Sequence, residues 1–162
     1  MKLLLFLLSS FMMASCTVST QREDKKAEEN KNLIKNLFTA FNRHDWKAMS
    51  EMYAEDFESL DPSSGKKRLQ QQRKYIVETY SGLQQYSPDI RDSVINLFAE
   101  ENRVVAEFIS TGTTAKGEKW MQPICTVFKI ENGLIVSDAT YYDRKSDYVF
   151  LTAGPSYRQI VP

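Results

Sequence analysis

The stretch RVVAEFISTGTTAKGEKWMQPICTVFKIENGLIVSDATYYD, residues 103–143, decides the fold. It is rich in β-branched and aromatic residues, which favour strands, and Glu131-Asn132-Gly133 interrupts it with the residues of a hairpin turn. One more strand is expected just before it, on the other side of a break at Glu101-Asn102. The predicted strands are Asp89–Phe98, Arg103–Thr113, Lys119–Ile130 and Leu134–Asp143. Four strands joined by short turns predict an antiparallel meander.

Helices are expected upstream of this meander. Apolar residues recur at helical spacing over residues 26–42 and predict a first helix there. Asp45 is placed to cap a short second helix that carries Tyr53 on its apolar side. A short extended piece then runs into a turn at residues 61–65, followed by a third helix over residues 66–83. Three N-terminal helices followed by a meander predict an α+β fold, with the helices packed on one face of the sheet.

The charge balance and the rarity of metal-ligating residues exclude several classes of function. Lys+Arg and Asp+Glu each number 21, so the net charge is zero, whereas binding to nucleic acid needs clustered positive charge. We therefore expect no nucleic-acid partner. The chain has one histidine, His44, and two cysteines, Cys16 and Cys125, which are too few for a zinc site. It also lacks a glycine-rich phosphate loop, so we expect neither a metal nor a cofactor.

The N-terminus has the pattern of a secretion signal. Lys2 precedes an apolar run that is too short to span a bilayer, and small residues precede Cys16. Met13-Ala14-Ser15-Cys16 resembles the bacterial lipobox, which implies lipidation of Cys16 and a location in the cell envelope, facing the periplasm or the cell surface. The alternative is an ordinary secretory signal with an incidental cysteine. The predicted divisions are a signal peptide over residues 1–15, a lipidated cysteine and polar tether over 16–28, a domain over 29–143 and a C-terminal extension over 144–162.

Several local strings resemble the nuclear-transport-factor-two-like superfamily, and in particular its SnoaL-like and ketosteroid-isomerase-like branches. Phe41 to Asp56 is similar to the first helical hairpin of that superfamily, and Leu60-Asp61-Pro62 with Gly65 is similar to its acidic-proline turn. Arg103–Thr113 and Glu131–Ile135 are similar to a middle strand and the final hairpin. The resemblance implies a cone-shaped fold, in which a curved, mostly antiparallel sheet of four to six strands encloses an apolar pocket. It also implies homodimers formed through the outer face of the sheet.

Residues two apart on a strand share a face, and the resemblance implies which of the two faces looks into the pocket. The side chains predicted to face inward are Val104, Ala106, Phe108, Ser110, Gln122, Ile124, Thr126, Phe128, Val136, Asp138, Thr140 and Tyr142. Glu107 and Cys125 then face outward. The predicted ligand-binding residues are Leu37, Phe41, Tyr53, Phe108, Gln122, Thr126, Thr140 and Tyr142. A mostly apolar face with a few polar groups is typical of a small-molecule site.

Two aspartates are candidates for proton transfer. Asp61 matches, by the resemblance, the catalytic base of the acidic-proline turn, although an aspartate before proline also commonly caps a turn. The oxyanion donors of the isomerase branch match Leu37 and Thr126, and Leu37 cannot donate a hydrogen bond, so we do not expect steroid-type isomerisation. Asp138 is expected either in the apolar pocket, where burial raises the pKa of its carboxyl, or at a solvated strand end. In the cyclase branch the corresponding acid matches a position nearer Thr140.

Three functions are left open by the sequence, and we favour the first. The first is a lipid-anchored domain that binds a hydrophobic small molecule without turnover. The second is an isomerase, cyclase or lyase that transfers a proton at Asp61, helped by Asp138 or Tyr142. The third is an interaction domain of the envelope that docks another protein on its outer sheet face. The expected partners are therefore a hydrophobic small molecule, the membrane and a second copy of the chain.

Overall fold

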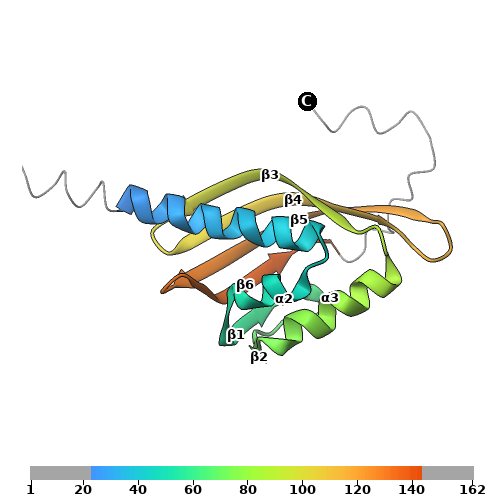
Figure 1. Cartoon of the computed structure of the whole chain (residues 1–162), viewed down its shortest axis with the longest axis horizontal. Coiled ribbons are helices and arrows are strands. Elements are labelled where there is room, and N and C mark those ends of the chain that lie inside the picture. Colours follow the sequence, from blue (N-terminus) through green and yellow to red (C-terminus); the bar gives the residue numbers. More distant parts are fainter. Residues whose placement is uncertain (1–22, 144–162) are drawn as a thin grey trace, which may run out of the picture.

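A curved six-stranded sheet with helices on its inner side forms the molecule (Figure 1). The computed structural model describes residues 23–143, and a helix covers residues 23–42. The elements that follow are α2 (Trp46–Glu51), β1 (Tyr53–Leu60), β2 (Leu69–Gln72), α3 (Lys74–Tyr86), β3 (Arg91–Glu100), β4 (Arg103–Thr113), β5 (Lys119–Glu131) and β6 (Leu134–Tyr141). The strand order is β2-β1-β6-β5-β4-β3, and every pair except the parallel β1–β6 pair is antiparallel. The predicted α+β fold with a mostly antiparallel sheet is thus confirmed.

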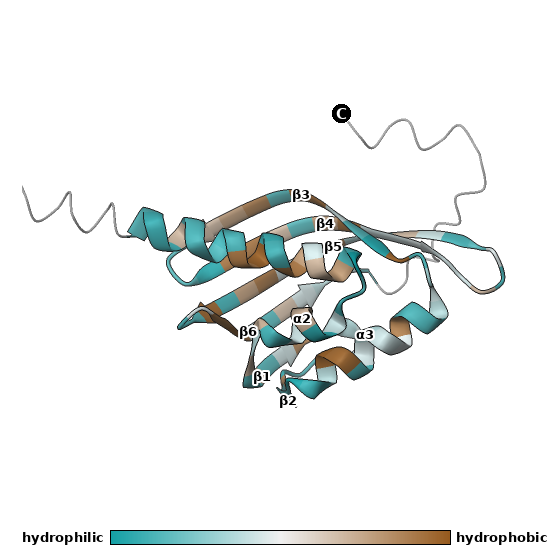
Figure 2. Cartoon of the chain, in the orientation of Figure 1, coloured by the Kyte–Doolittle hydropathy of each residue, from teal (hydrophilic) through white to brown (hydrophobic). Residues whose placement is uncertain are grey.

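The N-terminal helix packs its apolar side on the inner face of the meander (Figure 2). Its residues Leu37 and Phe41 belong to one hydrophobic cluster with Val104 of β4 and Phe128 of β5, and all four side chains are buried. Burying a large apolar side chain contributes about 1.5–3 kcal/mol relative to leaving it exposed. This packing holds the helix against strands that lie far from it in the sequence.

The third helix is shorter than predicted, because the first half of the predicted segment is a strand. Residues Leu69–Gln72 form β2, which pairs antiparallel with β1, and α3 begins only at Lys74. The side of β1 that β6 does not cover needs hydrogen-bond partners for its backbone, and β2 supplies them. Two strands, β1 and the edge strand β2, therefore precede α3. The predicted short extended piece lies in β1, but the prediction of three helices followed by the sheet is wrong, because β2 takes the place of the first part of the third helix. Tyr53, predicted on the second helix, is the first residue of β1.

A β-bulge changes the predicted face of one residue on the last strand. The pairing of β5 with β6 shifts between Lys129 and Ile130, so Ile135 lies opposite Ile130 and is fully buried. A bulge inserts one extra residue and reverses the alternation beyond it. Val136 consequently lies on the outer side of the sheet beside Ser137, contrary to the prediction. Asp138, beyond the bulge, faces inward as predicted.

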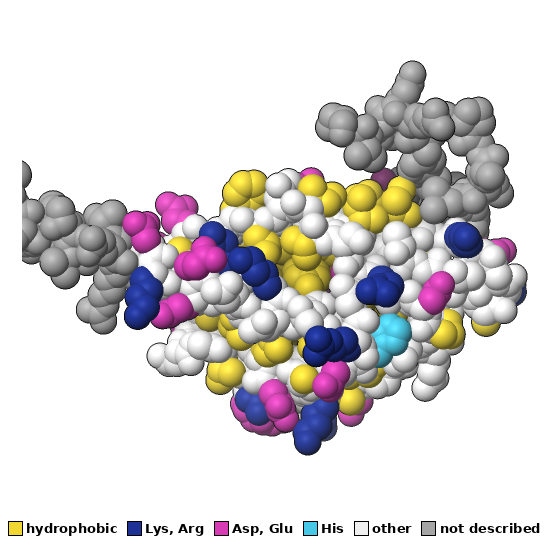
Figure 3. Space-filling view, turned by 45° about the horizontal axis from the view of Figure 1, so that its top comes forward, with side chains coloured by type: hydrophobic (Ala, Val, Ile, Leu, Met, Phe, Trp, Pro, Cys, Tyr) yellow, Lys and Arg dark blue, Asp and Glu magenta, His cyan; other side chains and the backbone are white. Residues whose placement is uncertain are grey.

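The predicted signal peptide, the lipidation site Cys16 and the C-terminal extension lie outside the described residues. Residues 23–28, the end of the predicted tether, are helical and mostly exposed. Within residues 23–143, no helix has the length and apolar character needed to cross a bilayer. Positive and negative side chains are interspersed over the face seen in Figure 3, with no large area of one sign.

Candidate functional site

A cavity of about 470 Å³ lies between the helices and the inner face of the sheet. The structure places all ten side chains that we predicted as catalytic or ligand-binding on its wall. These are Leu37, Phe41, Tyr53, Asp61, Phe108, Gln122, Thr126, Asp138, Thr140 and Tyr142. This volume is in the usual range for small-molecule sites. The role of each side chain towards a ligand stays a prediction.

Aromatic rings form much of the cavity wall and pack against one another. The ring of Phe38 meets that of Phe108 edge-on, with centroids 4.8 Å apart, which links the N-terminal helix to β4. The ring of Phe41 meets that of Tyr80 edge-on at 5.6 Å, which links the same helix to α3. The ring of Trp46 in α2 stacks on the ring of Tyr80, with centroids 5.7 Å apart. Such contacts stabilise beyond their buried area and give the wall a fixed shape.

Asp138 is a buried carboxyl group at the inner face of β6. Its side chain is only 9% exposed, and Tyr53 Oη donates a hydrogen bond of 3.0 Å to Asp138 Oδ2. Burial raises the pKa of Asp138 to about 6; hydrogen bonds from Ser59 and Tyr53 oppose the rise, and the charge of Asp61 adds to it. The alternative of a solvated strand end is therefore wrong. Asp138 can exchange a proton near neutral pH.

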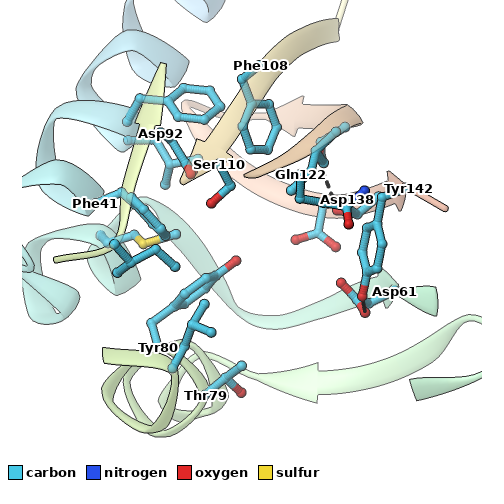
Figure 4. Close-up of a pocket in the computed structure, with 18 of the residues that line it drawn as sticks. Phe41, Asp61, Thr79, Tyr80, Asp92, Phe108, Ser110, Gln122, Asp138 and Tyr142 are labelled. Carbon is cyan, nitrogen blue, oxygen red and sulfur yellow. Dashed lines mark hydrogen bonds between the residues drawn. The ribbon is translucent and has the colours of Figure 1, made fainter. Parts of the chain in front are cut away.

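Asp61 has the capping role that we considered as an alternative, and it also borders the cavity. Its Oδ1 accepts a hydrogen bond of 2.7 Å from the Ser63 backbone N–H, and it thereby caps the short helical turn Pro62–Ser64. The same oxygen accepts a hydrogen bond of 3.0 Å from Tyr142 Oη. Figure 4 shows Asp61, Tyr142 and Asp138 on one side of the cavity. The capping bonds hold the Asp61 carboxyl in place without removing it from the site.

Asp92 is a third carboxyl group of the cavity, and it was missed in the sequence. It lies on β3 directly opposite Ser110 of β4, and its side chain is 8% exposed. Asn42 fixes the backbone at this point, because its side-chain amide donates to Asp92 O and accepts from Asp92 N, both at 2.8 Å. Within residues 23–143, Asp92 Oδ1 has no hydrogen-bond partner. Burial raises the pKa of the Asp92 carboxyl to about 7, and a hydrogen bond with Ser110 partly opposes the rise.

One signal could have identified Asp92 in advance. Ser110 was predicted to face the pocket, and residues directly opposite each other in an antiparallel pair share a face. Finding Asp92 opposite Ser110 requires the register of the β3–β4 hairpin, which shifts by a bulge between Val94 and Asn96. Counting back from the turn without that bulge places Asp92 on the wrong face.

Tyr80 of α3 points into the space between Asp92 and Asp138 (Figure 4). Burial and the charges of Asp138, Asp92 and Asp61 raise the pKa of the Tyr80 hydroxyl, so it stays protonated. Among the described residues that line the cavity there is no Lys, Arg or His. The polar part of the wall thus includes three carboxyl groups, the amide of Gln122 and several hydroxyl groups. Among these hydroxyl groups are Thr126 and Thr140, whose oxygens lie 3.0 Å apart.

Solved structures with this fold come from several bacteria. The chain is similar to AclR, a proposed hydroxylase from Streptomyces galilaeus, with 18% identity, a TM-score of 0.65 and coverage of 74% of this chain and 78% of that one. It is also similar to IdmH, a proposed polyketide cyclase from Streptomyces antibioticus (20% identity, TM-score 0.63, coverage 70% and 91%). A proposed ketosteroid isomerase from Kribbella flavida gives 16% identity, a TM-score of 0.60 and coverage of 85% and 90%. At these identities the likeness is one of fold.

The sequence itself matches one family. No curated protein matches the chain, but the profile of the SnoaL-like domain matches residues 34–138. This match covers more than half of the chain, and it spans all the wall residues described above except Thr140 and Tyr142. The protein therefore belongs to the SnoaL-like domain family, within the ketosteroid-isomerase-like fold.

Proposed function

We propose that this domain binds a small, mainly apolar molecule in its cavity and is held at the cell envelope by a lipid on Cys16. The observation that carries the proposal is the aromatic and aliphatic wall with a few inward polar groups, the usual construction of a small-molecule site. Leu37, Phe41 and Phe108 supply apolar contacts, and Gln122 and Thr140 supply polar ones.

A thermal-shift screen of the chain from Thr17 onward tests binding. The panel contains sterols, polyketide-like aromatics, fatty acids and apolar amines and alcohols. A ligand at 100 times its dissociation constant adds about 2.7 kcal/mol to the free energy of unfolding, which raises Tm by roughly 5–10 °C in a domain of this size. Stabilisation by none of the compounds would contradict the proposal.

A lipid anchor is the part of the proposal that concerns location. The lipobox-like sequence Met13-Ala14-Ser15-Cys16 supports it. Firm membrane attachment needs more than one acyl chain, and a cysteine lipidated in this way carries several. Metabolic labelling with a fatty-acid probe is expected to label the wild-type protein and not the Cys16→Ser variant. Secretion of an unlabelled wild-type protein would instead support an ordinary signal peptide.

Proton-transfer catalysis is a second candidate function, as an isomerase, cyclase or lyase. The buried Asp138 carboxyl supports it, because a pKa of about 6 suits a group that takes and returns a proton near neutral pH. The hydrogen-bonded pair Asp61 and Tyr142 lies on the same side of the cavity and supplies a second acidic group there. Once a ligand is found, its turnover by wild type and loss of turnover in Asp61→Asn or Asp138→Asn, with binding retained, would favour an enzyme. Binding without turnover favours the first proposal.

Protein docking is the third candidate, and it uses the opposite side of the sheet. Phe98 of β3 is 61% exposed and lies opposite Val105, on the side away from the cavity. This exposed apolar side chain supports a contact between two copies of the chain or with another envelope protein. A substitution here is expected to leave ligand binding unchanged.

A further inference from the structure

The charged groups of the cavity are all acidic. Asp61, Asp92 and Asp138 line it, and no described Lys, Arg or His does. Elsewhere the protein pairs its carboxylates with cations, for example Glu58 with Arg68 at 3.0 Å. Arg68 also donates to Ser137 Oγ and lies on the outer side of the sheet. It does not line the cavity, although its charge has a small lowering effect on the pKa of Asp138.

The Asp92 carboxyl is left without a full set of partners. More than nine-tenths of the residue is buried, and its Oδ1 has no hydrogen-bond partner within residues 23–143. A buried acceptor that stays unpaired is costly, and more so when it is charged. Two hydrogen bonds with the Asn42 side chain fix the backbone of Asp92, and the Asp92 side chain lines the cavity. Because Asp92 lines the cavity, a ligand that donates a hydrogen bond and carries positive charge would pair with this carboxyl group.

We infer that the molecule bound in the cavity is an apolar amine in its protonated form, whose ammonium group donates to Asp92 and faces Asp138. The inference rests on the proposed binding function and narrows it to one class of ligand. The aromatic rings of Tyr80, Phe41 and Phe108 line the same space, and aromatic faces attract ammonium groups and hold their hydrocarbon parts. The apolar body of the amine fills the remainder of the cavity.

Two other ligand classes fit the same observations less well. Anions such as fatty acids and oxo-acids meet three carboxyl groups and no described cation in the cavity, and like charges in a low dielectric repel strongly. A metal ion needs three or more ligating side chains close together, and no such group of His, Cys, Asp and Glu exists in residues 23–143. To bind, a monovalent organic cation needs only one nearby carboxylate and apolar side chains around its hydrocarbon part.

The pH dependence of binding has a definite sign. An ammonium ligand is held best by carboxylates, and burial places the pKa of Asp92 at about 7 and that of Asp138 at about 6. The other titratable side chains on the cavity wall are Asp61, Tyr53, Tyr80, Tyr86 and Tyr142. The Asp92 and Asp138 carboxyl groups ionise progressively as the pH rises from 5.5 to 8, so the affinity for the amine rises over this interval. A neutral ligand of the same shape gains nothing from this ionisation.

The test compares 4-phenylbutylamine with its neutral and anionic counterparts, 4-phenylbutanol and 4-phenylbutyrate, by calorimetric titration of the full-length protein. Because hydrogen bonds to charged groups are stronger than those between neutral groups, the amine is expected to bind about tenfold or more tightly than the alcohol at pH 8. This preference is expected to shrink at pH 5.5. Asp92→Asn keeps the shape of the side chain and is expected to abolish most of the preference. Asp56→Asn, the same change on an exposed residue of β1, is expected to preserve it.

The results that would contradict the amine inference can be distinguished from those that would contradict the proposed binding function. Equal affinity for amine and alcohol, or tighter binding of the alcohol or the carboxylate, would overturn the amine inference and leave the binding function intact. An amine preference that survives in Asp92→Asn would place the ammonium group elsewhere and overturn the inference too. If none of the three compounds binds and the wider panel produces no thermal shift, both the inference and the proposed function fail.

Discussion

At the scale of single residues, the acidic side chains of the cavity lower the stability of the fold, and they are also the groups that can bind a ligand or transfer a proton. Asp92 and Asp138 are carboxyl groups in an apolar wall, and burial raises the pKa of both. A group that binds protons more tightly in the folded state than in the unfolded state loses its stabilising contribution as the pH rises. The same two groups that could handle a proton or hold an amine therefore destabilise the empty domain at alkaline pH.

The stability of the domain is thus expected to fall as the pH rises from about 4 to about 7, the interval between the ordinary pKa of an aspartate and that of buried Asp92. Asp92→Asn removes this ionisation and is expected to stabilise the protein at pH 8 by roughly 2–4 kcal/mol relative to wild type. At pH 4 the two proteins should have similar stability. Urea denaturation at both pH values measures this, with Asp56→Asn as control. An Asp92→Asn variant that is no more stable than wild type at pH 8 would contradict the assigned burial.

At the scale of elements, the strands β3 to β6 were predictable from the sequence, and the edge strand β2 was not. Residues 103–143 carry strong local signals, because turn residues separate long runs of strand-forming residues, and β4, β5 and β6 lie where predicted within a few residues. β2 has only four residues, and its leucine is exposed. Its strand conformation comes from pairing with β1, and no local sequence pattern predicts this pairing. The bulge in β6 and the one in β3 likewise depend on register between strands.

The same limit explains which parts of the site could be predicted. Asp61 could be placed at the site because its turn resembles that of the family, and Asp138 because strand alternation was combined with the register that the resemblance implies. Asp92 could not, because its face depends on the bulge in β3. Tyr80 was expected in the core or the pocket wall, but its position among the three acids follows from how α3 packs, which the sequence pattern leaves open.

A substitution at Gly112 on β4 tests how closely this strand packs against Ser87, which follows α3, and Trp120 of β5. A Cβ atom there would lie 2.2 Å from Ser87 Oγ and 2.9 Å from the Trp120 ring. Ser87 also accepts a hydrogen bond from Trp120 Nε1 at 3.1 Å, so neither side chain can move freely. Gly112→Ala is expected to lower the free energy of unfolding by about 1–3 kcal/mol. The matched control is Gly82→Ala in α3, where an added Cβ meets nothing within 4 Å and helix propensity favours alanine by about 1 kcal/mol. Urea denaturation should show opposite signs for the two variants; equal signs would contradict the packing at Gly112.

At the scale of the whole molecule, the sheet separates two surfaces with different tasks. Its inner face and the helices enclose the cavity, and its outer face carries the exposed Phe98 near the β3 edge. The proposed lipid on Cys16 would attach the molecule to the membrane through the residues that precede the N-terminal helix. Ligand binding and self-association are then independent properties, which separate substitutions can remove one at a time.

Self-association is tested with Phe98→Glu. If two copies meet through the outer face, sedimentation velocity should find a dimer for the wild type and a monomer for this variant, because a charge buried without a partner at an interface is strongly unfavourable. Leu69→Glu makes the same change on an exposed leucine at the opposite edge of the sheet, on β2, and should remain dimeric. A monomeric wild type would remove the homodimer from the proposal without affecting the cavity.

The most direct test of the central claim, that the cavity is a binding site for an apolar small molecule, is amide chemical-shift mapping with a compound that raises Tm. The account predicts that the shifted signals belong to cavity residues, including Leu37, Phe108, Thr126 and Asp138, while those of Glu107 and Phe98 stay in place. Shifts confined to the outer face, with unchanged signals from the cavity residues, would contradict the claim.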